Sequence, residues 1–235
     1  MLRPLLRGLG LLLLVAVIAL FLLQASYYVR VRQYATENPS TTAFMELRLE
    51  ELREKNADAE LRHRWVAWDR ISPWLKRAVI AAEDARFVEH HGIDWEALRK
   101  AFDENVEAGR VVRGGSTISQ QLAKNLFLSP ERSYLRKVQE ALIAVMIEQA
   151  LGKQRILELY LNVIEWGEGV FGAEAAAYHY HGVSAGELNR WQASLLAARI
   201  PNPRYYSRRG VTDYLYRRGF DIYGWADKVR VPGRN

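Results

Sequence analysis

The sequence predicts a mainly α-helical domain behind one N-terminal transmembrane helix. Leu9–Leu23 holds no polar side chain, as a membrane-spanning segment requires. From Ser72 to Pro203, segments with apolar residues at three- and four-residue spacing alternate with Gly, Pro and capping residues, a pattern typical of consecutive helices. The sequence contains no strand-rich section and no internal repeat, so we expect helices throughout the domain.

The first 29 residues are predicted to form a membrane anchor. Residues 1–8 are a short basic N-terminus, and residues 9–29 are an apolar span that ends near Tyr27 and Tyr28, as interfacial aromatic residues do. The alternative is a cleaved signal peptide, but the apolar run is long and Leu23-Gln24-Ala25 matches a cleavage site poorly. Since a short basic N-terminus stays inside, we expect a single-pass protein of the cytoplasmic (inner) membrane whose remaining residues lie on the periplasmic side.

Residues 30–70 are predicted to be a linker and a charged helix. Tyr34–Thr42 is polar and contains a proline, whereas Met45–His63 carries glutamates and arginines at helical spacing. We expect this helix to present a solvated face rather than a site. Arg64–Trp68 is predicted to be a short extended segment.

A helix that begins at Ser72 carries the first candidate catalytic residue. Ser72 is a suitable N-cap, and Pro73 suits the first helical position. Glu83 falls on the apolar face of this helix, four residues after Val79 and four before Phe87. It is either a tolerated edge glutamate or an acid/base group whose pKa is raised by burial, and periodicity alone leaves the two alternatives even.

The segment Gly114–Leu128 follows a predicted helix at Trp95–Ala108 and a loop with exposed Val111 and Val112. Two glycines precede Thr117-Ile-Ser-Gln120, a capping box, and the free N–H groups of such a helix start can bind an anion. Spacing alone favours the alternative, an ordinary capped helix.

A second glutamate lies in Tyr134–Leu151, a segment that is apolar almost all round and is therefore predicted to be buried centrally. Glu140 is either paired with Arg136 one turn earlier or functional, because an unpaired buried carboxylate is costly. Further helices are predicted at Gln154–Trp166, Val170–Tyr180 and Leu188–Ile200, the last opened by a capping box at Ser184–Glu187, and residues 204–235 form a basic, aromatic tail.

Composition limits the possible functions. The chain has no cysteine, which excludes disulfides, thiol nucleophiles and cysteine-based metal sites. A formal charge of +6 favours anionic partners such as nucleic acid, acidic lipid or a phosphate-bearing substrate. Because no nucleic-acid-binding module occurs, we expect no nucleic acid partner.

Five segments of the chain resemble, in order, the motifs of the family 51 peptidoglycan glycosyltransferases. They are EDARFVEHHG (Glu83–Gly92), GGSTISQQLAKN (Gly114–Asn125), RKVQE (Arg136–Glu140), KQRILELYLN (Lys153–Asn162) and ASLLAARIPNP (Ala193–Pro203). The resemblance implies a lysozyme-like helical catalytic domain at residues 71–203, with a large lobe and a small membrane-associated jaw. No transpeptidase domain is expected after it, which indicates a monofunctional enzyme. The implied activity is polymerisation of lipid II, a lipid-pyrophosphate disaccharide-pentapeptide, into β-1,4-linked glycan strands.

The resemblance also implies roles for individual residues. Glu83 would be the general base for the acceptor hydroxyl, and Glu140 would orient the donor pyrophosphate or a bound divalent cation, Mg²⁺ or Mn²⁺. The substrate-binding positions are Ser116, Thr117, Lys124 and Arg132. Positions that shape or support the cleft are Asp84, Phe87, His90, Gly92, Gly115, Gln120, Gln121, Asn125 and Arg136. Expected partners are lipid II, the growing glycan strand, membrane lipid and other cell-wall synthesis or division proteins.

Two rival functions remain. A lytic transglycosylase or lysozyme-type hydrolase needs an acid glutamate but no pyrophosphate-binding cations, so Lys124 and Arg132 argue against it. A non-enzymatic, membrane-anchored scaffold would use the charged helix to recruit partners and would not depend on Glu83.

Overall fold

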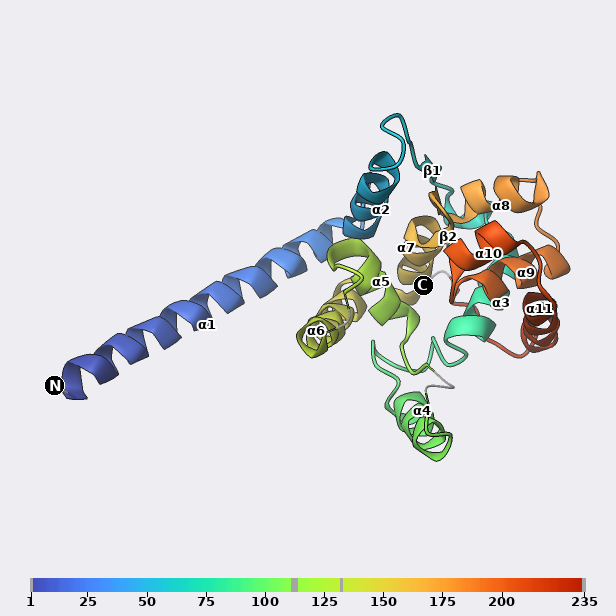
Figure 1. The fold of residues 1–235 in the computed structure, drawn as a ribbon. Coiled ribbons are helices and arrows are strands. Elements are labelled where there is room, and N and C mark those ends of the chain that lie inside the picture. Colours follow the sequence, from blue (N-terminus) through green and yellow to red (C-terminus); the bar gives the residue numbers. More distant parts are fainter. Residues whose placement is uncertain (1, 111–113, 132, 234–235) are drawn as a thin grey trace.

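A computed structural model describes residues 2–110, 114–131 and 133–233 of the chain. Within them, α1 (Leu2–Gln33) projects from a domain built from the remaining elements, as Figure 1 shows. The domain is mainly helical, as predicted. Its helices are α2 (Ala43–Arg53), α3 (Pro73–Glu83), α4 (Trp95–Glu107), α5 (Ile118–Phe127), α6 (Tyr134–Ala150), α7 (Lys153–Val163), α8 (Ala173–His181), α9 (Arg190–Arg199), α10 (Pro203–Arg209), α11 (Asp213–Trp225) and the 3₁₀ turn η1 (Trp68–Arg70).

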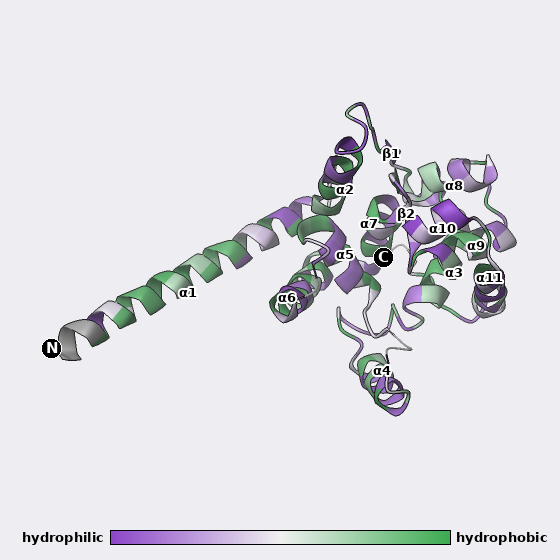
Figure 2. Cartoon of the chain, in the orientation of Figure 1, coloured by the Kyte–Doolittle hydropathy of each residue, from purple (hydrophilic) through white to green (hydrophobic). Residues whose placement is uncertain are grey.

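Helix α1 has the length and apolarity of a membrane span over Leu6–Gln33, as predicted for the N-terminal segment. Figure 2 shows its apolar residues along most of its length. The helix continues into the domain, where Val31 is fully buried and the Tyr27 ring packs edge-on against Phe127 of α5. Gln24 exchanges hydrogen bonds of 2.8 and 3.0 Å with Gln139 of α6. The anchor is therefore packed on the domain rather than joined to it by a loose linker.

The charged helix is shorter than predicted. Helix α2 ends at Arg53, not at His63, because Asn56 Oδ1 accepts the Asp58 N–H and forms a turn that competes with further helix. Its face is also not wholly solvated, since Phe44 and Met45 are buried.

A small three-stranded sheet replaces parts of three predicted helices, Met45–His63, Gln154–Trp166 and Val170–Tyr180. Strand β3 (Val170–Phe171) lies between β1 (Arg62–His63), which is parallel, and β2 (Glu165–Gly167), which is antiparallel. In register, Arg62 pairs with Val170 and Glu165 with Phe171. Helix α7 therefore stops before Trp166, and α8 starts only after Gly172, whose φ of 80° a helix cannot continue.

The core has two connected parts. Helices α3, α9 and α11 pack together, and α5 packs against α6 and α7. Most residues of α7 are buried. Residues of both parts belong to one continuous buried cluster. Helix α11 lies in the segment predicted to be a tail, yet it covers α9 and α3 and belongs to the packed domain.

Two apolar helix faces are exposed instead of buried. Helix α6 was predicted to lie in the centre, but only one side of it, with Glu140, Ile143 and Ile147, is buried. Its other side exposes Tyr134, Leu135, Val138 and Leu142. Helix α4 stands apart from the larger body in Figure 1 and exposes Trp95, Leu98, Phe102 and Val106.

The start of α9 also differs from the prediction. Ser184 donates to Glu187 as a capping box would, but this pair closes a turn. The helix begins at Arg190 under a second capping box, formed by Asn189 and Gln192. The two boxes are five residues apart, and sequence alone could not rank them.

Candidate active site

The last residue of α3 is Glu83. The helix starts where predicted, with Ser72 Oγ accepting the Trp74 N–H, and it ends because Asp84 adopts an extended φ of −162°. The Glu83 side chain is only 10% exposed. Its Oε2 accepts a 2.8 Å hydrogen bond from Gln121 Nε2, whereas Oε1 has no hydrogen-bond partner among the described residues and lies 3.9 Å from Arg218 Nη2.

The environment of Glu83 raises its pKa. Burial is the main cause, because it disfavours the charged form, and the negative charge of Asp84 acts in the same direction. The Gln121 hydrogen bond and the positive charges of Arg218 and Lys124 oppose this rise. Glu83 is therefore a better proton acceptor than an ordinary surface glutamate, as a general base must be.

A buried hydrogen-bond network fixes the turn that follows Glu83. Asp84 accepts the Ile118 N–H of α5 at 2.9 Å, and His90 Nε2 lies 2.9 Å from its other oxygen. Thr117 donates to the Gly92 carbonyl at 2.6 Å. Gly92 has a φ of 95°, and a Cβ there would lie 3.2 Å from the Ala144 carbonyl oxygen, so this position favours glycine.

The predicted anion-binding turn is built as expected at its helix start. Thr117 and Gln120 form the capping box of α5, and Gly115 passes so close to α4 that a Cβ would lie 3.1 Å from Leu98 Cα. The Thr117 hydroxyl is already engaged with Gly92 and the Gln120 N–H. Ser116 is the turn residue whose hydroxyl meets a cation, Lys137 Nζ, at 2.9 Å.

Gln121 links Glu83 to the core. While its Nε2 donates to Glu83, its Oε1 accepts a 2.9 Å hydrogen bond from the fully buried Tyr160 hydroxyl. The tyrosine therefore holds the amide in the orientation that donates to the carboxylate.

The Glu83–Gln121 hydrogen bond connects the linings of two cavities, because Glu83 lines one and Gln121 lines the other. The first, the Glu83 cavity, has a volume of about 560 Å³ and is lined by Glu83, Asp84, Gly114–Thr117, Arg218 and Trp225. The second, the Lys124 cavity, measures about 360 Å³, and its lining includes Gln121, Lys124, Asn125, Arg136 and Glu165. A group in either cavity can approach the boundary formed by this hydrogen-bonded pair.

Lys124 supplies positive charge to the second cavity. Burial lowers its pKa, as do Arg136 and Lys137, whereas Glu140 and Glu83 raise it. Its Nζ lies 5.7 Å from the centre of the Phe44 ring, which belongs to α2. The amine is thus poorly solvated and accessible to an anion in the cavity.

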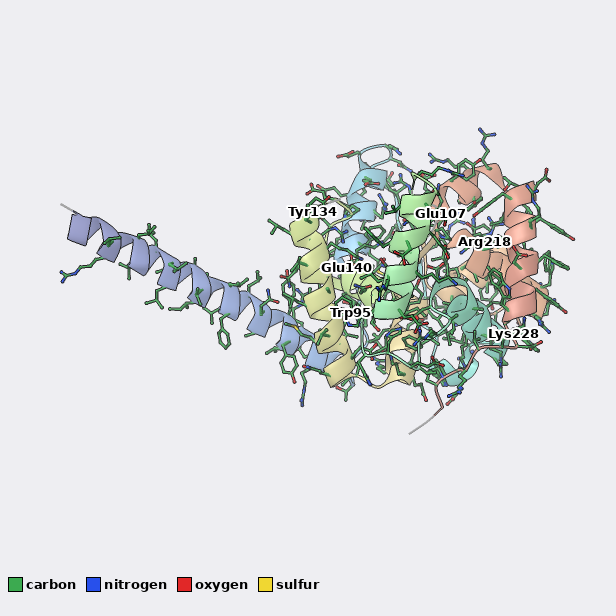
Figure 3. The ribbon with its side chains drawn as sticks, turned by 90° about the horizontal axis from the view of Figure 1, so that it is seen from below. Trp95, Glu107, Tyr134, Glu140, Arg218 and Lys228 are labelled. Atoms are coloured by element: carbon green, nitrogen blue, oxygen red, sulfur yellow. The ribbon has the colours of Figure 1, made fainter. Side chains whose placement is uncertain are left out.

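Glu140 is paired on both of its oxygens. Arg136 Nη1 lies 2.6 Å from Oε2, as the four-residue spacing predicts, and Lys137 Nζ contacts Oε1. Figure 3 shows Glu140 on α6. This buried carboxylate holds together the cations that surround it, and Lys137 extends the group to Ser116.

Comparison with known proteins places the chain in a family. A family model described as transglycosylase matches residues 49–221. The chain belongs to the transglycosylase family. Biosynthetic peptidoglycan transglycosylases of Janthinobacterium sp. (strain Marseille), Laribacter hongkongensis (strain HLHK9) and Azoarcus sp. (strain BH72) are 54%, 56% and 56% identical to it. The matches cover 94%, 99% and 88% of this chain and 96%, 100% and 89% of theirs.

The family assignment confirms the resemblance found in five motifs, and it confirms the predicted class of enzyme, a glycosyltransferase. The lysozyme-like helical fold predicted from it agrees with the helical domain described above. Arg132 and the exposed Val111 and Val112 of the predicted jaw lie outside the described residues.

Sequence reasoning missed several residues of this transglycosylase site. Lys137 could have been found from its three-residue spacing to Glu140. Arg218 and Phe44 reach the site from distant elements, and no local pattern marks them. Tyr160 lies within the motif KQRILELYLN, but the motif does not show that its hydroxyl reaches Gln121. Phe87, predicted to shape the cleft, is fully buried in the core, where Lys153 Nζ lies 4.5 Å from its ring centre.

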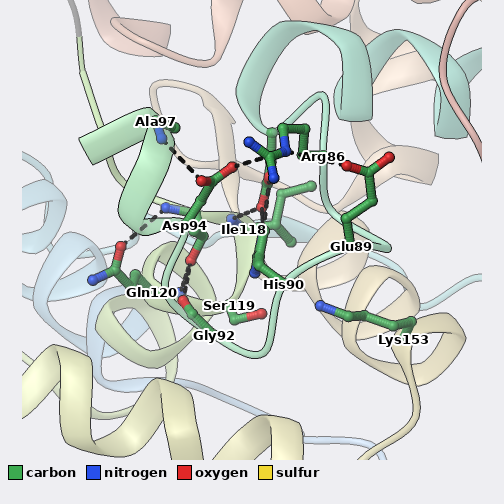
Figure 4. A network of polar contacts seen from close by, with 12 residues as sticks. Arg86, Glu89, His90, Gly92, Asp94, Ala97, Ile118, Ser119, Gln120 and Lys153 are labelled. Atoms are coloured by element: carbon green, nitrogen blue, oxygen red, sulfur yellow. Dashed lines mark hydrogen bonds and ion pairs between the residues drawn. The ribbon is translucent and has the colours of Figure 1, made fainter. Parts of the chain in front are cut away.

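The described acidic groups do not fit a metal ion well. Asp84, His90 and Asp94 offer ligand atoms within 4.8 Å of one another, but the Asp84 oxygens already accept from His90 and Ile118. Figure 4 shows Asp94 bonded to the Ala97 N–H and paired with Arg86, whose Nε lies 3.8 Å away. A cation here would displace hydrogen bonds and meet a guanidinium.

Proposed function

We propose that this chain polymerises lipid II into β-1,4-linked peptidoglycan strands and releases the lipid pyrophosphate with inversion at the anomeric carbon. The observation that carries the proposal is the position of Glu83. It is a buried carboxylate with one oxygen that accepts no hydrogen bond from the described residues, between a cavity it lines itself and a second cavity that holds Lys124 and Arg136.

On the acceptor side, Glu83 acts as the general base. The sugar that bears the attacking 4-hydroxyl lies in the Glu83 cavity, and Oε1 takes the hydroxyl proton as the oxygen bonds to the anomeric carbon of the growing strand. Gln121 holds Oε2, so that the carboxylate keeps its orientation. The raised pKa of Glu83 brings its basicity closer to that of the attacking group and favours proton transfer.

On the donor side, the pyrophosphate leaves with the electron pair of the broken glycosidic bond. Its developing negative charge is stabilised by Lys124 and Arg136, with Lys137 holding Ser116 at the turn. Arg132 is assigned to the same task from its motif position. Glu140 acts by positioning Arg136 and Lys137 rather than by touching the reacting atoms.

A divalent cation is not used in this mechanism. The predicted role of Mg²⁺ or Mn²⁺ was to be oriented by Glu140, but Arg136 and Lys137 already contact the two oxygens of that carboxylate. A metal ion would have to displace one of them. The protein's own cations can supply the same charge to the leaving group.

The substrate's lipid explains the membrane anchor. We place α1 across the cytoplasmic membrane with its N-terminus inside, because the residues before the span are basic and Tyr27 and Tyr28 lie near its far end. The exposed apolar residues of α4 and α6, among them Trp95 and Tyr134 in Figure 3, then contact membrane lipid, α4 as part of the jaw. Lipid II, the growing strand and lipid are the partners this arrangement supports.

The test is polymerisation of labelled lipid II by the purified full-length chain in detergent, read as a glycan ladder on a gel. Glu83→Gln removes the base and is isosteric, so we expect the rate to fall about 10²- to 10⁴-fold with the fold preserved. Glu50→Gln, at an exposed position of α2, is the matched control and should retain full activity.

Two results would contradict the proposal. Wild-type protein that cleaves cell-wall glycan and leaves lipid II untouched would be a lytic enzyme. Glu83→Gln protein that polymerises lipid II like wild type, or that fully complements a strain lacking the enzyme, would exclude Glu83 as the base and favour a scaffold.

A further inference from the structure

Another buried carboxylate, Glu165 of β2, lines the Lys124 cavity. Its side chain is 4% exposed, and its Oε2 accepts a 3.2 Å hydrogen bond from Arg48 Nε. Its Oε1 is buried and has no hydrogen-bond partner among the described residues. Since a buried acceptor without a partner costs about 1–3 kcal/mol, this oxygen calls for an explanation.

The carboxylate is held in place by an ionic network. Arg48 also binds Glu51 at 2.7 Å, and Arg204 binds Glu51 at 3.0 Å and lies 3.7 Å from Glu168. Burial raises the pKa of Glu165, whereas the positive charges of Arg48 and Arg204 and hydrogen bonds from Arg48 and the Gly169 backbone oppose that rise. The network therefore fixes Oε2, and Oε1 is the oxygen that lacks a hydrogen bond from the described residues.

The surroundings of Glu165 indicate which group that is. A carboxylate repels phosphate, so the pyrophosphate belongs near Lys124 and Arg136, and the part of the cavity beside Glu165 is left for a sugar. Arg48 and Arg204, which are engaged with the carboxylates of the ionic network, also line the cavity. The other lining residues include apolar and amide side chains: Ile164, Ile200, Pro201, Asn125 and Asn202. An acetamido group matches this set, because it combines an N–H donor, a carbonyl acceptor and a methyl group.

We propose that Glu165 Oε1 accepts the N–H of an acetamido group on the strand sugar in the Lys124 cavity and so selects N-acetylated donors. The inference rests on the proposed function and deepens it, since it names a recognition element of the same cleft. Its chemistry is binding only, and Glu165 takes no part in bond making. The interaction exists before and during the reaction, so its loss raises KM and changes kcat little.

The first test is Glu165→Gln. Because Arg48 Nε donates toward this side chain, the glutamine must turn its oxygen to Arg48 and present its NH₂ group, a donor, to the cavity. Two donors would then face each other, and we expect KM for lipid II to rise about 10- to 100-fold. Glu168→Gln is the matched control, because Glu168 binds the same network through Arg204 but does not line this cavity; it should leave KM unchanged.

The second test uses lipid II analogues in which an acetate ester replaces the acetamido group on one sugar or the other. The ester keeps the shape and loses the N–H. One of the two analogues should raise KM for the wild type and cause no further rise in Glu165→Gln, as expected of two changes that remove one interaction.

Each possible outcome decides the question. If Glu165→Gln melts like wild type and has the same KM, the inference is wrong. If its KM rises but neither ester affects the wild type, the partner of Glu165 is not an acetamido group, and the inference is again wrong. If the wild type consumes no lipid II at all, the proposed function is wrong, and the inference, which rests on it, is wrong as well.

Discussion

The hydrogen bond from Gln121 to Glu83 should set the acid limit of activity. It is 2.8 Å long and joins a half-buried amide to a carboxylate that is 10% exposed. The amide donates to the ionised form and therefore lowers the pKa of Glu83 against the effect of burial. Replacing Gln121 by leucine removes this donor, so the pKa of Glu83 must rise further.

The size of the shift follows from the strength of such a bond. A hydrogen bond to a charged group contributes about 1.5–3 kcal/mol, which corresponds to a rise of about 1–2 pH units in the pKa of Glu83. A general base must be deprotonated, so activity falls as the pH drops through this pKa. In Gln121→Leu the acid limb of the kcat/KM profile should therefore move to higher pH by about that amount.

The control separates this effect from damage to the core. Gln121→Leu also leaves the buried Tyr160 hydroxyl without its acceptor, which should destabilise the protein by about 1–3 kcal/mol. Tyr160→Phe breaks the same contact from the other side, and Gln121 still donates to Glu83, because turning the amide would place its oxygen against the carboxylate. We expect it to lose stability while its acid limb stays near that of the wild type. An unmoved acid limb in folded Gln121→Leu would refute the role given to this hydrogen bond.

Two further substitutions test the charge and the backbone of the site. The pKa of Lys124 is lowered by burial, so the alkaline limb of the kcat/KM profile should lie below the usual lysine range. In Lys124→Arg this limb should move to higher pH and kcat should fall, because arginine stays charged but has a different shape. An identical alkaline limb in the two proteins would contradict this assignment. Gly92→Ala places a Cβ 3.2 Å from the Ala144 carbonyl oxygen at a φ of 95° and should cost about 1–3 kcal/mol in thermal unfolding. Gly224→Ala, where a Cβ meets nothing within 4 Å, should be neutral or slightly stabilising, and equal melting temperatures for the two variants would count against the strain argument.

Local signals in the sequence predicted local structure well. The start of α3 at Ser72 and Pro73, the capping box of Thr117 with Gln120, and the Arg136–Glu140 pair all lie within a few residues of their partners. Such features depend on neighbours along the chain, so the sequence displays them directly. The placement of Glu83 on a buried surface followed from the same periodicity.

Long-range features of the site could not be predicted in the same way. Arg218 donates to the Ala82 carbonyl across 136 positions of sequence, and Arg48 reaches Glu165 across 117. No spacing rule connects residues so far apart. The family resemblance named the motif residues, but Arg218, Arg48 and Glu165 lie outside those motifs.

The exposure of α6 was predicted wrongly for a different reason. An apolar helix is expected to be buried when water is the only solvent. Helix α6 instead packs beside α1, the candidate membrane span, and exposes Tyr134 and Leu135 on its other side. The rule for soluble domains does not apply to a helix that, under the proposed function, lies close to a bilayer.

The continuous helix α1 has a consequence for how the enzyme meets its substrate. Leu23, at the end of the uninterrupted apolar run, and the buried Val31 lie on one helix, about 12 Å apart at 1.5 Å per residue. If α1 spans the membrane as proposed, the cleft is held at a set height and in a set rotational orientation above the lipid surface. Enzyme and lipid-linked sugar would then search for each other in two dimensions, and the phosphates would arrive at the same level each time. The proposed function therefore confines chain growth to a thin layer at the membrane face.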